Sequence, residues 1–286
     1  MKICLFCQSR FDSELWQCPV CGFTPRCYAG RYIFSPILAE ENDSFPVALF
    51  EDLTKLENKN FWFRSRNKLI LWALKKYFSH MNHFFEIGCG TGYVLSAIEQ
   101  FFPGLTLTGS DIYLKGLEFA SKRLKKVELF QMDARNIPFL NEFDVIGAFD
   151  VLEHVDDDER VLSQMYQAVK QGGGVILTVP QHQCLWGSMD EISCHKRRYS
   201  KKDLINKCEK AGFTIHKITS FVSILFPIMW ISRLKKSNKD LKDDLSLNKF
   251  FNFTFDQAVG LDRLLIKMGF DLPFGGSLLV VAKKEN

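Results

Sequence analysis

Apolar and polar residues alternate in two different rhythms along most of this chain. Between residues 83 and 221, apolar runs of strand length are each followed by segments whose apolar side chains recur every three to four positions, the spacing of an amphipathic helix. The run FDVIGAFD at 143–150 is apolar on both faces, as a strand is when helices cover both sides of a parallel sheet. We predict strands at 83–88, 105–111, 127–133, 143–150, 173–180, 213–221 and 276–284.

Helices are predicted between these strands and ahead of the first one. Asp156 is expected to cap one helix, with Glu159 completing a capping box, and Ser200 to cap another, with Asp203 three residues on. The predicted helices cover 49–78, 91–102, 112–124, a segment from Asp156, and 201–212. This alternation favours an α/β fold with a Rossmann-like, seven-stranded, mostly parallel sheet and helices on both faces.

Four cysteines near the start of the chain form two Cys-x-x-Cys pairs. Cys4 and Cys7 make the first pair, and Cys18 and Cys21 follow after ten residues. Two such pairs can offer four thiolates to a tetrahedral zinc ion, and so short a segment needs the metal in order to fold. The segment resembles a zinc ribbon of the rubredoxin-like kind, which implies a structural Zn²⁺.

These features divide the chain into a zinc ribbon at 1–30, a linker at 31–48 and an α/β domain at 49–286, with an apolar insert at about 220–260. The net charge of +4 is mild, which counts against a protein devoted to nucleic acid. The start of the chain lacks the apolar run of a signal peptide, and nine cysteines suit thiols and metal ligands better than disulfides. We therefore expect a cytoplasmic protein.

The most specific motif is the glycine-rich turn Glu86-Ile-Gly88-Cys89-Gly90-Thr-Gly92, which follows the first strand of the α/β domain. A nicotinamide-binding fingerprint would need glycine where Tyr93 stands, and the ending of a P-loop is missing. Asp111 closes the next strand 19 residues after Gly92, the spacing expected of an acid that binds ribose hydroxyls.

This ExGxGxG turn with Asp111 resembles motif I of the class I S-adenosylmethionine-dependent methyltransferases, and the resemblance covers about residues 49–286. It implies S-adenosyl-L-methionine as cofactor. Asp133 would then accept from the adenine amino group, and Arg64, or Arg66 in its place, would bind the methionine carboxylate. The resemblance gives as cofactor-binding residues Arg64, Glu86, Gly88, Cys89, Gly90, Gly92, Asp111, Ile112, Asp133, Ala134 and Asp150.

The sequence Glu153-His154-Val155, after the strand at 143–150, looks like that of small-molecule O-methyltransferases of ubiquinone-type pathways. Some of those enzymes hold a divalent cation with a Glu-x-x-Glu-His set. Here Asp150 occupies the first position, one methylene shorter, which puts that metal in doubt. His154 is either a general base, since its ordinary pKa suits neutral pH, or a structural residue that orients the loop.

A basic cluster, SCHKRRYS at 193–200, follows the strand at 173–180. It resembles a bacterial subgroup of the ubiquinone-methyltransferase type, in which an Asp…His…Arg-Arg-Tyr segment folds over the acceptor pocket. The alternative is a solvated basic turn that leads into a helix. The resemblance makes Asp190, His195, Arg198 and Tyr199 acceptor-side candidates, with His182 weaker, and His154, His195 and Tyr199 the catalytic candidates.

The stretch FVSILFPIMWIS at 221–232 is almost wholly apolar and is followed by Arg233, Lys235 and Lys236. It is too short to span a bilayer. Such a segment either lies in a membrane interface or forms a helix pair that covers the active site. The first alternative would bring the protein to the inner face of the membrane and would suit a lipid-linked acceptor.

The sequence thus favours O-methylation of a small-molecule or lipid-linked acceptor. The Asn-Pro-Pro-aromatic signature of amino methyltransferases is absent after the strand at 143–150, which counts against N-methylation of a nucleic-acid base or a protein amide. Two alternatives stay open. The protein could methylate RNA and use the ribbon to recognise it, or it could be a non-catalytic module that senses the cofactor and recruits a partner through the ribbon.

Overall fold

The computed structural model describes residues 1–40, 45–234 and 248–285. In these residues, nine strands form one sheet in the order β10-β11-β9-β8-β5-β6-β7-β4-β3. All seven strands predicted from the sequence are present in it. They are β5 (His83–Ile87), β6 (Thr106–Asp111), β7 (Val127–Gln131), β8 (Phe143–Phe149), β9 (Val169–Pro180), β10 (Thr214–Phe221) and β11 (Ser277–Lys283).

The direction of the strands determines where a ligand can bind. β5 lies between β6 and β8, and the five strands from β7 to β9 across the sheet are parallel. β10 and β11 add an antiparallel edge. The chain leaves β5 toward β6 on one side and later reaches β8 on the other. This reversal opens a crevice at the carboxyl ends of the strands, where open α/β sheets bind their ligands.

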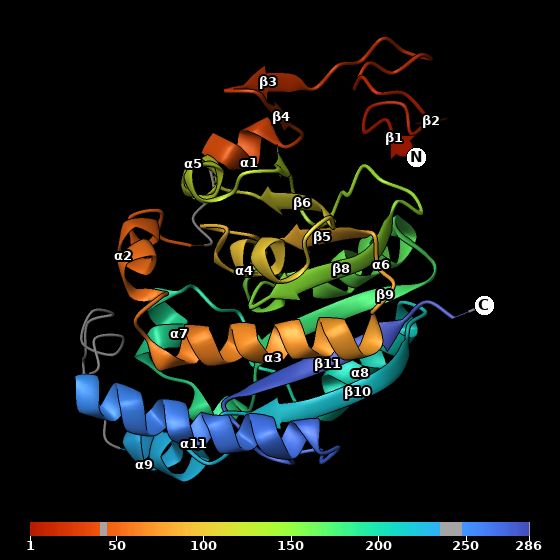
Figure 1. Cartoon of the computed structure of the whole chain (residues 1–286). Coiled ribbons are helices and arrows are strands. Elements are labelled where there is room, and N and C mark those ends of the chain that lie inside the picture. Colours follow the sequence, from red (N-terminus) through yellow and green to blue (C-terminus); the bar gives the residue numbers. More distant parts are fainter. Residues whose placement is uncertain (41–44, 235–247, 286) are drawn as a thin grey trace.

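Helices cover both faces of the sheet, as the alternating pattern predicts (Figure 1). One face carries apolar side chains of α3, α4, α5 and α11, and the other carries those of α6 and α8. The bounds are α3 (Phe61–Tyr77), α4 (Tyr93–Phe101), α5 (Leu114–Arg123), α6 (Asp158–Ala168), α8 (Lys201–Lys210) and α11 (Lys249–Lys267). The predicted α/β fold is confirmed.

Two local predictions about helices are wrong. The helix expected over 49–78 is two helices, α2 (Leu49–Leu56) and α3, because the Asn60 side chain accepts a hydrogen bond from the Trp62 amide and starts a new helix. Asp157, not Asp156, caps α6 by accepting from the Arg160 amide. The predicted cap of α8 is present, because the Ser200 hydroxyl accepts a hydrogen bond from the Asp203 amide.

Part of the first forty residues joins the large sheet instead of forming a separate ribbon and linker. β1 (Lys2–Ile3) and β2 (Arg10–Phe11) pair with each other, while β3 (Arg26–Tyr28) and β4 (Arg31–Ile33) extend the large sheet beyond β7. A short helix, α1 (Pro36–Glu40), follows. Part of the predicted linker at 31–48 is therefore a sheet strand and a helix, and residues 41–44 of it lie outside the described residues.

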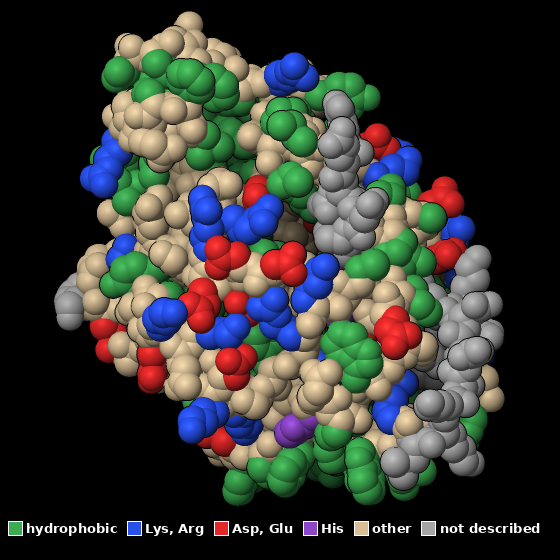
Figure 2. Space-filling model, turned by 180° about the vertical axis from the view of Figure 1, so that it is seen from behind, with side chains coloured by type: hydrophobic (Ala, Val, Ile, Leu, Met, Phe, Trp, Pro, Cys, Tyr) green, Lys and Arg blue, Asp and Glu red, His purple; other side chains and the backbone are tan. Residues whose placement is uncertain are grey.

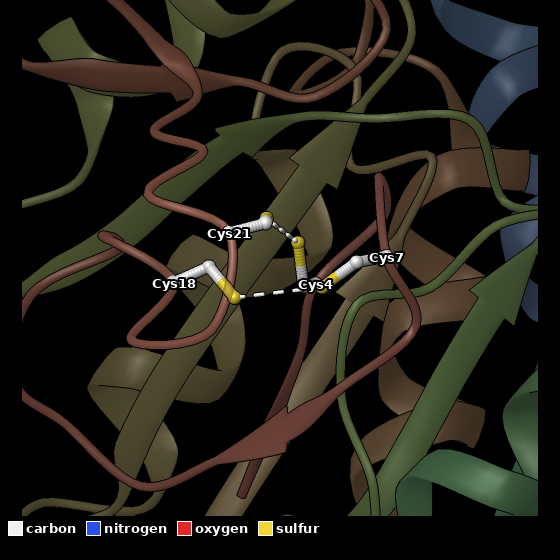
Figure 3. Close-up of side chains that lie close together, drawn as sticks. All are labelled: Cys4, Cys7, Cys18 and Cys21. Atoms are coloured by element: carbon white, nitrogen blue, oxygen red, sulfur yellow. Dashed lines mark hydrogen bonds between the residues drawn. The ribbon is translucent and has the colours of Figure 1, made fainter.

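The four cysteines of the two Cys-x-x-Cys pairs meet in one cluster, drawn in Figure 3. The Cys4 and Cys21 sulfurs lie 3.6 Å apart, as do those of Cys7 and Cys18. Thiolates bound tetrahedrally to zinc are roughly 3.8 Å from one another, given a Zn–S bond of about 2.3 Å. Hydrogen bonding from Ser9 lowers the pKa of Cys18 to about 6, which favours the thiolate that zinc needs. The thiols therefore fit a structural zinc ion.

Trp16 joins this ribbon to the main core. Its side chain is 4% exposed and packs edge-on against Phe34, Phe130 and Phe139, which come from three different segments. The ribbon and the sheet therefore share one apolar core.

We predict that Trp16→Ala lowers the free energy of unfolding of the whole chain by about 3–5 kcal/mol, because it removes a buried indole and leaves a cavity. Chemical denaturation of the zinc-loaded protein, followed by circular dichroism, measures this. Leu15→Ala is the matched control, since Leu15 is 64% exposed and its loss should change stability by less than about 0.5 kcal/mol. Equal stability of both variants would show that the ribbon is not part of the core.

Candidate active site

A cavity of about 820 Å³ opens at the carboxyl ends of β5, β6 and β8, within the size range of cofactor sites. Its lining brings together residues that the sequence assigned separately to the cofactor and to the acceptor. Those expected at the cofactor and found in the lining are Glu86, Gly88, Cys89, Gly90, Asp111, Ile112, Asp133, Ala134 and Asp150. The acceptor-side residues in the lining are His154, Asp190, His195 and Arg198.

The glycine-rich turn after β5 has the tight backbone that its sequence predicts. Gly88 has a φ of 66°, and a Cβ added there would lie 2.5 Å from a methyl group of Val151. Gly92 is left-handed at the start of α4, and a Cβ there would lie 3.1 Å from the backbone of Ala120. Gly92 does not line the cavity, and the lack of a side chain there lets α4 approach α5 closely.

Asp111 ties the two ligand-binding turns together. One of its carboxylate oxygens accepts from the Gly90 amide and the other from the Tyr113 amide, both at 2.8 Å. Burial raises the pKa of Asp111 to about 6, although these hydrogen bonds oppose the rise. The group is ionised at neutral pH and can still accept from a ligand hydroxyl in the cavity.

Residues in and just after α2 also hold the glycine-rich turn, although the sequence analysis did not assign this helix to the site. Glu57, just after α2, accepts from the Thr91 hydroxyl at 2.5 Å and from Arg123 at 2.8 Å. Burial raises the pKa of Glu57, and the neighbouring Arg123 acts in the opposite direction. Phe50 of α2 lines the cavity beside Gly90. The amphipathic pattern of 49–56 was the only sequence signal for this wall.

Arg66, rather than Arg64, reaches the cavity from α3. The Arg66 guanidinium forms an ion pair with Asp150 and stacks over the Trp62 ring. Arg64 instead donates to the Lys59 carbonyl and approaches Asp256, and it is not part of the lining. The choice of Arg64 for the methionine carboxylate thus disagrees with the geometry, because the two arginines point to different sides of one helix.

Asp150 has a φ of 58°, a left-handed conformation that asparagine and aspartate tolerate better than most residues. Besides Arg66, its carboxylate accepts from the Thr178 hydroxyl at 3.2 Å. Strained residues of this kind concentrate at functional sites. At the carboxyl end of β8, Asp150 and the Arg66 side chain of α3 therefore form a charged pair that lines the cavity.

The acceptor end of the cavity is built around Asp190, whose side chain is fully buried in α7 (Ser188–Ile192). It accepts from the Nδ1 atom of His195 at 2.8 Å and from two nitrogens of Arg198 at 2.8 and 2.9 Å. These partners lower the pKa of Asp190 against the effect of burial. His195 in turn packs edge-on against His154, with 4.7 Å between ring centroids.

Tyr199 does not face this cavity, so the expectation that it is catalytic is corrected. Its side chain is fully buried, and its hydroxyl donates to Asp158 of α6 at 2.6 Å. Burial and this hydrogen bond raise the pKa of Tyr199. His182 also lies outside the lining, between Phe226 and Phe274.

Every cation of the basic cluster is paired with an acid. Lys196 lies 3.9 Å from Asp156, Arg197 lies 3.1 Å from Asp158, and Arg198 holds Asp190. Across the face in Figure 2, basic and acidic side chains are likewise intermixed. Of these pairs, only Arg198 and Asp190 both line the cavity, whereas Lys196 and Asp156 pair at the surface.

The apolar stretch at 221–232 forms another wall of the cavity through α9 (Phe226–Leu234). Arg233 ties α9 to the loop after β9 by donating to the Leu185 carbonyl at 3.1 Å. Outward-facing Trp230 and Ile231 are 47% and 54% exposed. No helix within the described ranges is long and apolar enough to cross a membrane. Lys235 and Lys236 lie outside the described residues.

The Glu-x-x-Glu-His metal set of some ubiquinone-type enzymes does not assemble here. Asp150, which replaces its first acid, is already paired with Arg66 and Thr178. Glu153 and His154 do come together, but their third neighbour is His195, with one potential ligand atom of each residue within 4.8 Å of the others.

Residues 58–218 match a family model described as a methyltransferase domain, which is more than half of the chain. The chain belongs to this family. The methyltransferase domain is 34% identical over 93 residues to demethylmenaquinone methyltransferase of Thermotoga maritima and 32% identical over 99 residues to ubiquinone biosynthesis O-methyltransferase of Pseudomonas entomophila. Each match covers 32% of this chain and 41% or 42% of the relative, so the chain spans about two fifths of their length.

Solved structures share the architecture of this methyltransferase domain. Phosphoethanolamine N-methyltransferase 2 of Haemonchus contortus, in complex with S-adenosyl-L-methionine, has a TM-score of 0.57 at 17% identity and covers 88% of this chain and 60% of that chain. The [4+2]-cyclase SpnF has a TM-score of 0.53 at 18% identity and covers 78% and 83%. The resemblance to the methyltransferases that the glycine-rich turn suggested is therefore confirmed at the level of family and fold.

We predict that the affinity for S-adenosylmethionine falls about fourfold between pH 7.5 and pH 5.5, because protonation of Asp111 below its pKa of about 6 removes its acceptor for the ribose hydroxyls. Isothermal titration calorimetry at a series of pH values measures this. Asp111→Asn should bind weakly throughout and lose this dependence. The matched control Asp203→Asn, on α8 and outside the cavity lining, should keep it. An unchanged profile in Asp111→Asn would contradict the assignment.

The two arginines give a second prediction. Arg66→Met should weaken cofactor binding about tenfold or more, since it removes a charge-assisted partner for a carboxylate in the cavity. Arg64→Met should leave it unchanged, because Arg64 does not line the cavity. Equal losses in both variants, measured by the same titration, would contradict the distinction.

Proposed function

We propose that this protein transfers the methyl group of S-adenosylmethionine to an oxygen of a small-molecule or lipid-linked acceptor. The observation that carries the proposal is a single cavity lined at one end by the glycine-rich turn and Asp111 and at the other by His154 and His195. A cofactor and an acceptor bound there would share one cavity, where they could be aligned for in-line methyl transfer.

At the cofactor end, Asp111 would accept from ribose hydroxyls and Asp133 from the adenine amino group. The Asp133 carboxylate is steadied by the Arg135 amide at 2.9 Å and by the Arg135 side chain. Arg66 would bind the methionine carboxylate in place of its present partner, Asp150. Glu86 is buried beneath the turn, and burial raises its pKa, which suits a residue that orders the loop rather than one that touches the cofactor.

At the acceptor end, the hydroxyl of the acceptor would lose its proton as the new oxygen–methyl bond forms and the sulfur–methyl bond breaks, which releases S-adenosylhomocysteine. His195 is the group suited to handle that proton. Asp190 orients its ring and stabilises a positive charge on it, as carboxylates do for catalytic histidines. His154, in edge contact with His195, would help to align the hydroxyl.

The wall that α9 contributes favours an acceptor with an apolar portion. Leu225, Ile228 and Met229 line the cavity, while Ile228, Trp230 and Ile231 also expose apolar surface. Phe250 and Phe253 of α11 are 67% and 64% exposed. Apolar side chains gather at the lower end of the face in Figure 2, where Figure 1 has α9 and α11. A lipid-linked acceptor could pass from a membrane surface to the cavity along this side.

Relatives act on different atoms, so the acceptor is the finer part of the proposal. One relative is named as a ubiquinone biosynthesis O-methyltransferase and another, from Cereibacter sphaeroides, as a phosphatidylethanolamine N-methyltransferase. The cyclase of the same fold also illustrates that this architecture hosts other chemistry. RNA is disfavoured as an acceptor because the cations of the basic cluster are paired with acids.

The test is incubation of cell extract with the protein and methyl-labelled S-adenosylmethionine, followed by separation of lipid, small-molecule, RNA and protein fractions. Label in the lipid or small-molecule fraction, absent with Asp111→Asn, is the expected result. Label confined to RNA would support the RNA alternative, and cofactor binding with no label in any fraction would support the non-catalytic module. Either outcome would overturn the proposal.

The acceptor-side roles give a further prediction. His195→Asn should lower kcat by about 100-fold or more while cofactor affinity stays constant, because only proton transfer is impaired. Tyr199→Phe removes a buried hydrogen bond to Asp158 and should lower stability by about 1–1.5 kcal/mol without lowering kcat. Steady-state kinetics and chemical denaturation measure the two effects. A fall in kcat with Tyr199→Phe would reinstate that tyrosine as catalytic.

A further inference from the structure

Glu153 is a buried carboxylate without a compensating partner in the part of the chain that the structure describes. It lies in the short helical turn η1 (Leu152–His154) after β8 and lines the cavity. Its side chain is 0% exposed, and neither carboxylate oxygen has a hydrogen-bond partner among the described residues. Such a group costs several kcal/mol in its charged form unless something neutralises it.

Two neighbouring acids of the cavity, Asp150 and Asp190, do have cationic partners. Asp150 is paired with Arg66, and Asp190 is paired with Arg198 through two hydrogen bonds. Neither arginine donates a hydrogen bond to Glu153, so among the described residues its carboxylate has no cationic hydrogen-bond donor.

Two imidazoles complete the environment of Glu153. One potential ligand atom from each of Glu153, His154 and His195 lies within 4.8 Å of the other two. Ligand atoms around a divalent ion with bonds of about 2.0–2.2 Å are roughly 3–3.5 Å apart. Small side-chain rotations would bring the three atoms to that spacing.

The hydrogen bond between His195 and Asp190 is the outer support that metal-binding histidines generally have. An ionised Asp190 only accepts, so Nδ1 of His195 carries the proton, and the lone pair is on Nε2. Arg198 and the Gly187 amide fix Asp190 in turn. A carboxylate behind a histidine orients the ring and strengthens it as a ligand.

We propose that Glu153, His154 and His195 bind a divalent transition-metal ion at the acceptor end of the cavity. Two imidazoles and one carboxylate suit Zn²⁺ or Fe²⁺ better than Mg²⁺, which prefers an all-oxygen shell. The site differs from the Glu-x-x-Glu-His set in that His195, from the basic cluster after β9, replaces the first acid. Three protein ligands leave a position open for an acceptor oxygen, whose hydroxyl pKa the metal would lower. With Nε2 of His195 bound to the ion, this activation takes the place of proton abstraction by His195, and the hydroxyl proton leaves to solvent.

Only this role in acceptor activation rests on the proposed function, whereas metal binding by the three residues does not. The experiment therefore omits both cofactor and acceptor. The full chain, with its ribbon already loaded with one Zn²⁺, is titrated with Zn²⁺ at pH 7.5 by calorimetry, and metal content is checked by elemental analysis. The expected result is one further equivalent that millimolar Mg²⁺ does not displace.

The variants distinguish this site from the ribbon and from adventitious binding. Glu153→Gln and His195→Asn should weaken the second equivalent by roughly 100-fold and keep the first, while Asp190→Asn, which touches no metal, should weaken it by about 10–100-fold. His216→Asn is the matched control, because His216 is paired with Glu285 outside the cavity and should keep both equivalents.

The proposal is overturned if the unmodified protein binds only the ribbon ion, or if Glu153→Gln and His195→Asn keep the second equivalent with unchanged affinity. Glu153→Gln preserves side-chain shape and removes only the buried charge, so it tests the site even where His195→Asn or Asp190→Asn fails to fold. Cofactor titration of the same samples is read separately. Loss of S-adenosylmethionine binding in the unmodified protein would reject the proposed function and leave the metal result standing.

Discussion

The cofactor end of the cavity depends on the double hydrogen bond that Asp111 accepts from the Gly90 and Tyr113 amides. Through it, the turns after β5 and β6 hold each other at the point where the parallel strands diverge. Glu57, Thr91 and Arg123 hold the glycine-rich turn from the other side. The buried Asp111 carboxylate is thus a structural tie between the two turns, and the proposed function makes it a ligand acceptor as well.

Much of the architecture could be predicted because it is encoded locally. Apolar runs and helical periodicity predict the seven strands, since a sheet covered on both faces demands apolar side chains in its central strands. The glycine-rich turn, Asp111 and the two Cys-x-x-Cys pairs combine residue type with fixed spacing. By contrast, β3 and β4 are three residues each, and every residue of β3 is exposed, so no apolar rhythm marks them.

The side-chain pairings that define the site could not be predicted, because they join residues far apart in sequence. Arg66 meets Asp150 from 84 positions away, and Tyr199 meets Asp158 from 41 positions away. Consecutive residues of the basic cluster turn to opposite sides: Arg197 and Tyr199 approach α6, whereas His195 and Arg198 approach Asp190. Sequence shows that such a cluster exists, but only the fold decides which members reach the cavity.

The pairing of β4 with β7 has a consequence for how this domain avoids self-association. Without the first forty residues, β7 would be an uncovered edge strand, and such edges promote pairing with other molecules. The N-terminal hairpin pairs with the carboxyl end of β7 at Ile33 and Gln131, and its outer strand β3 is short and begins with Arg26, where charge and brevity discourage further pairing. If the ribbon folds only with zinc, as its four cysteines suggest, the protection of this sheet edge would depend on metal supply.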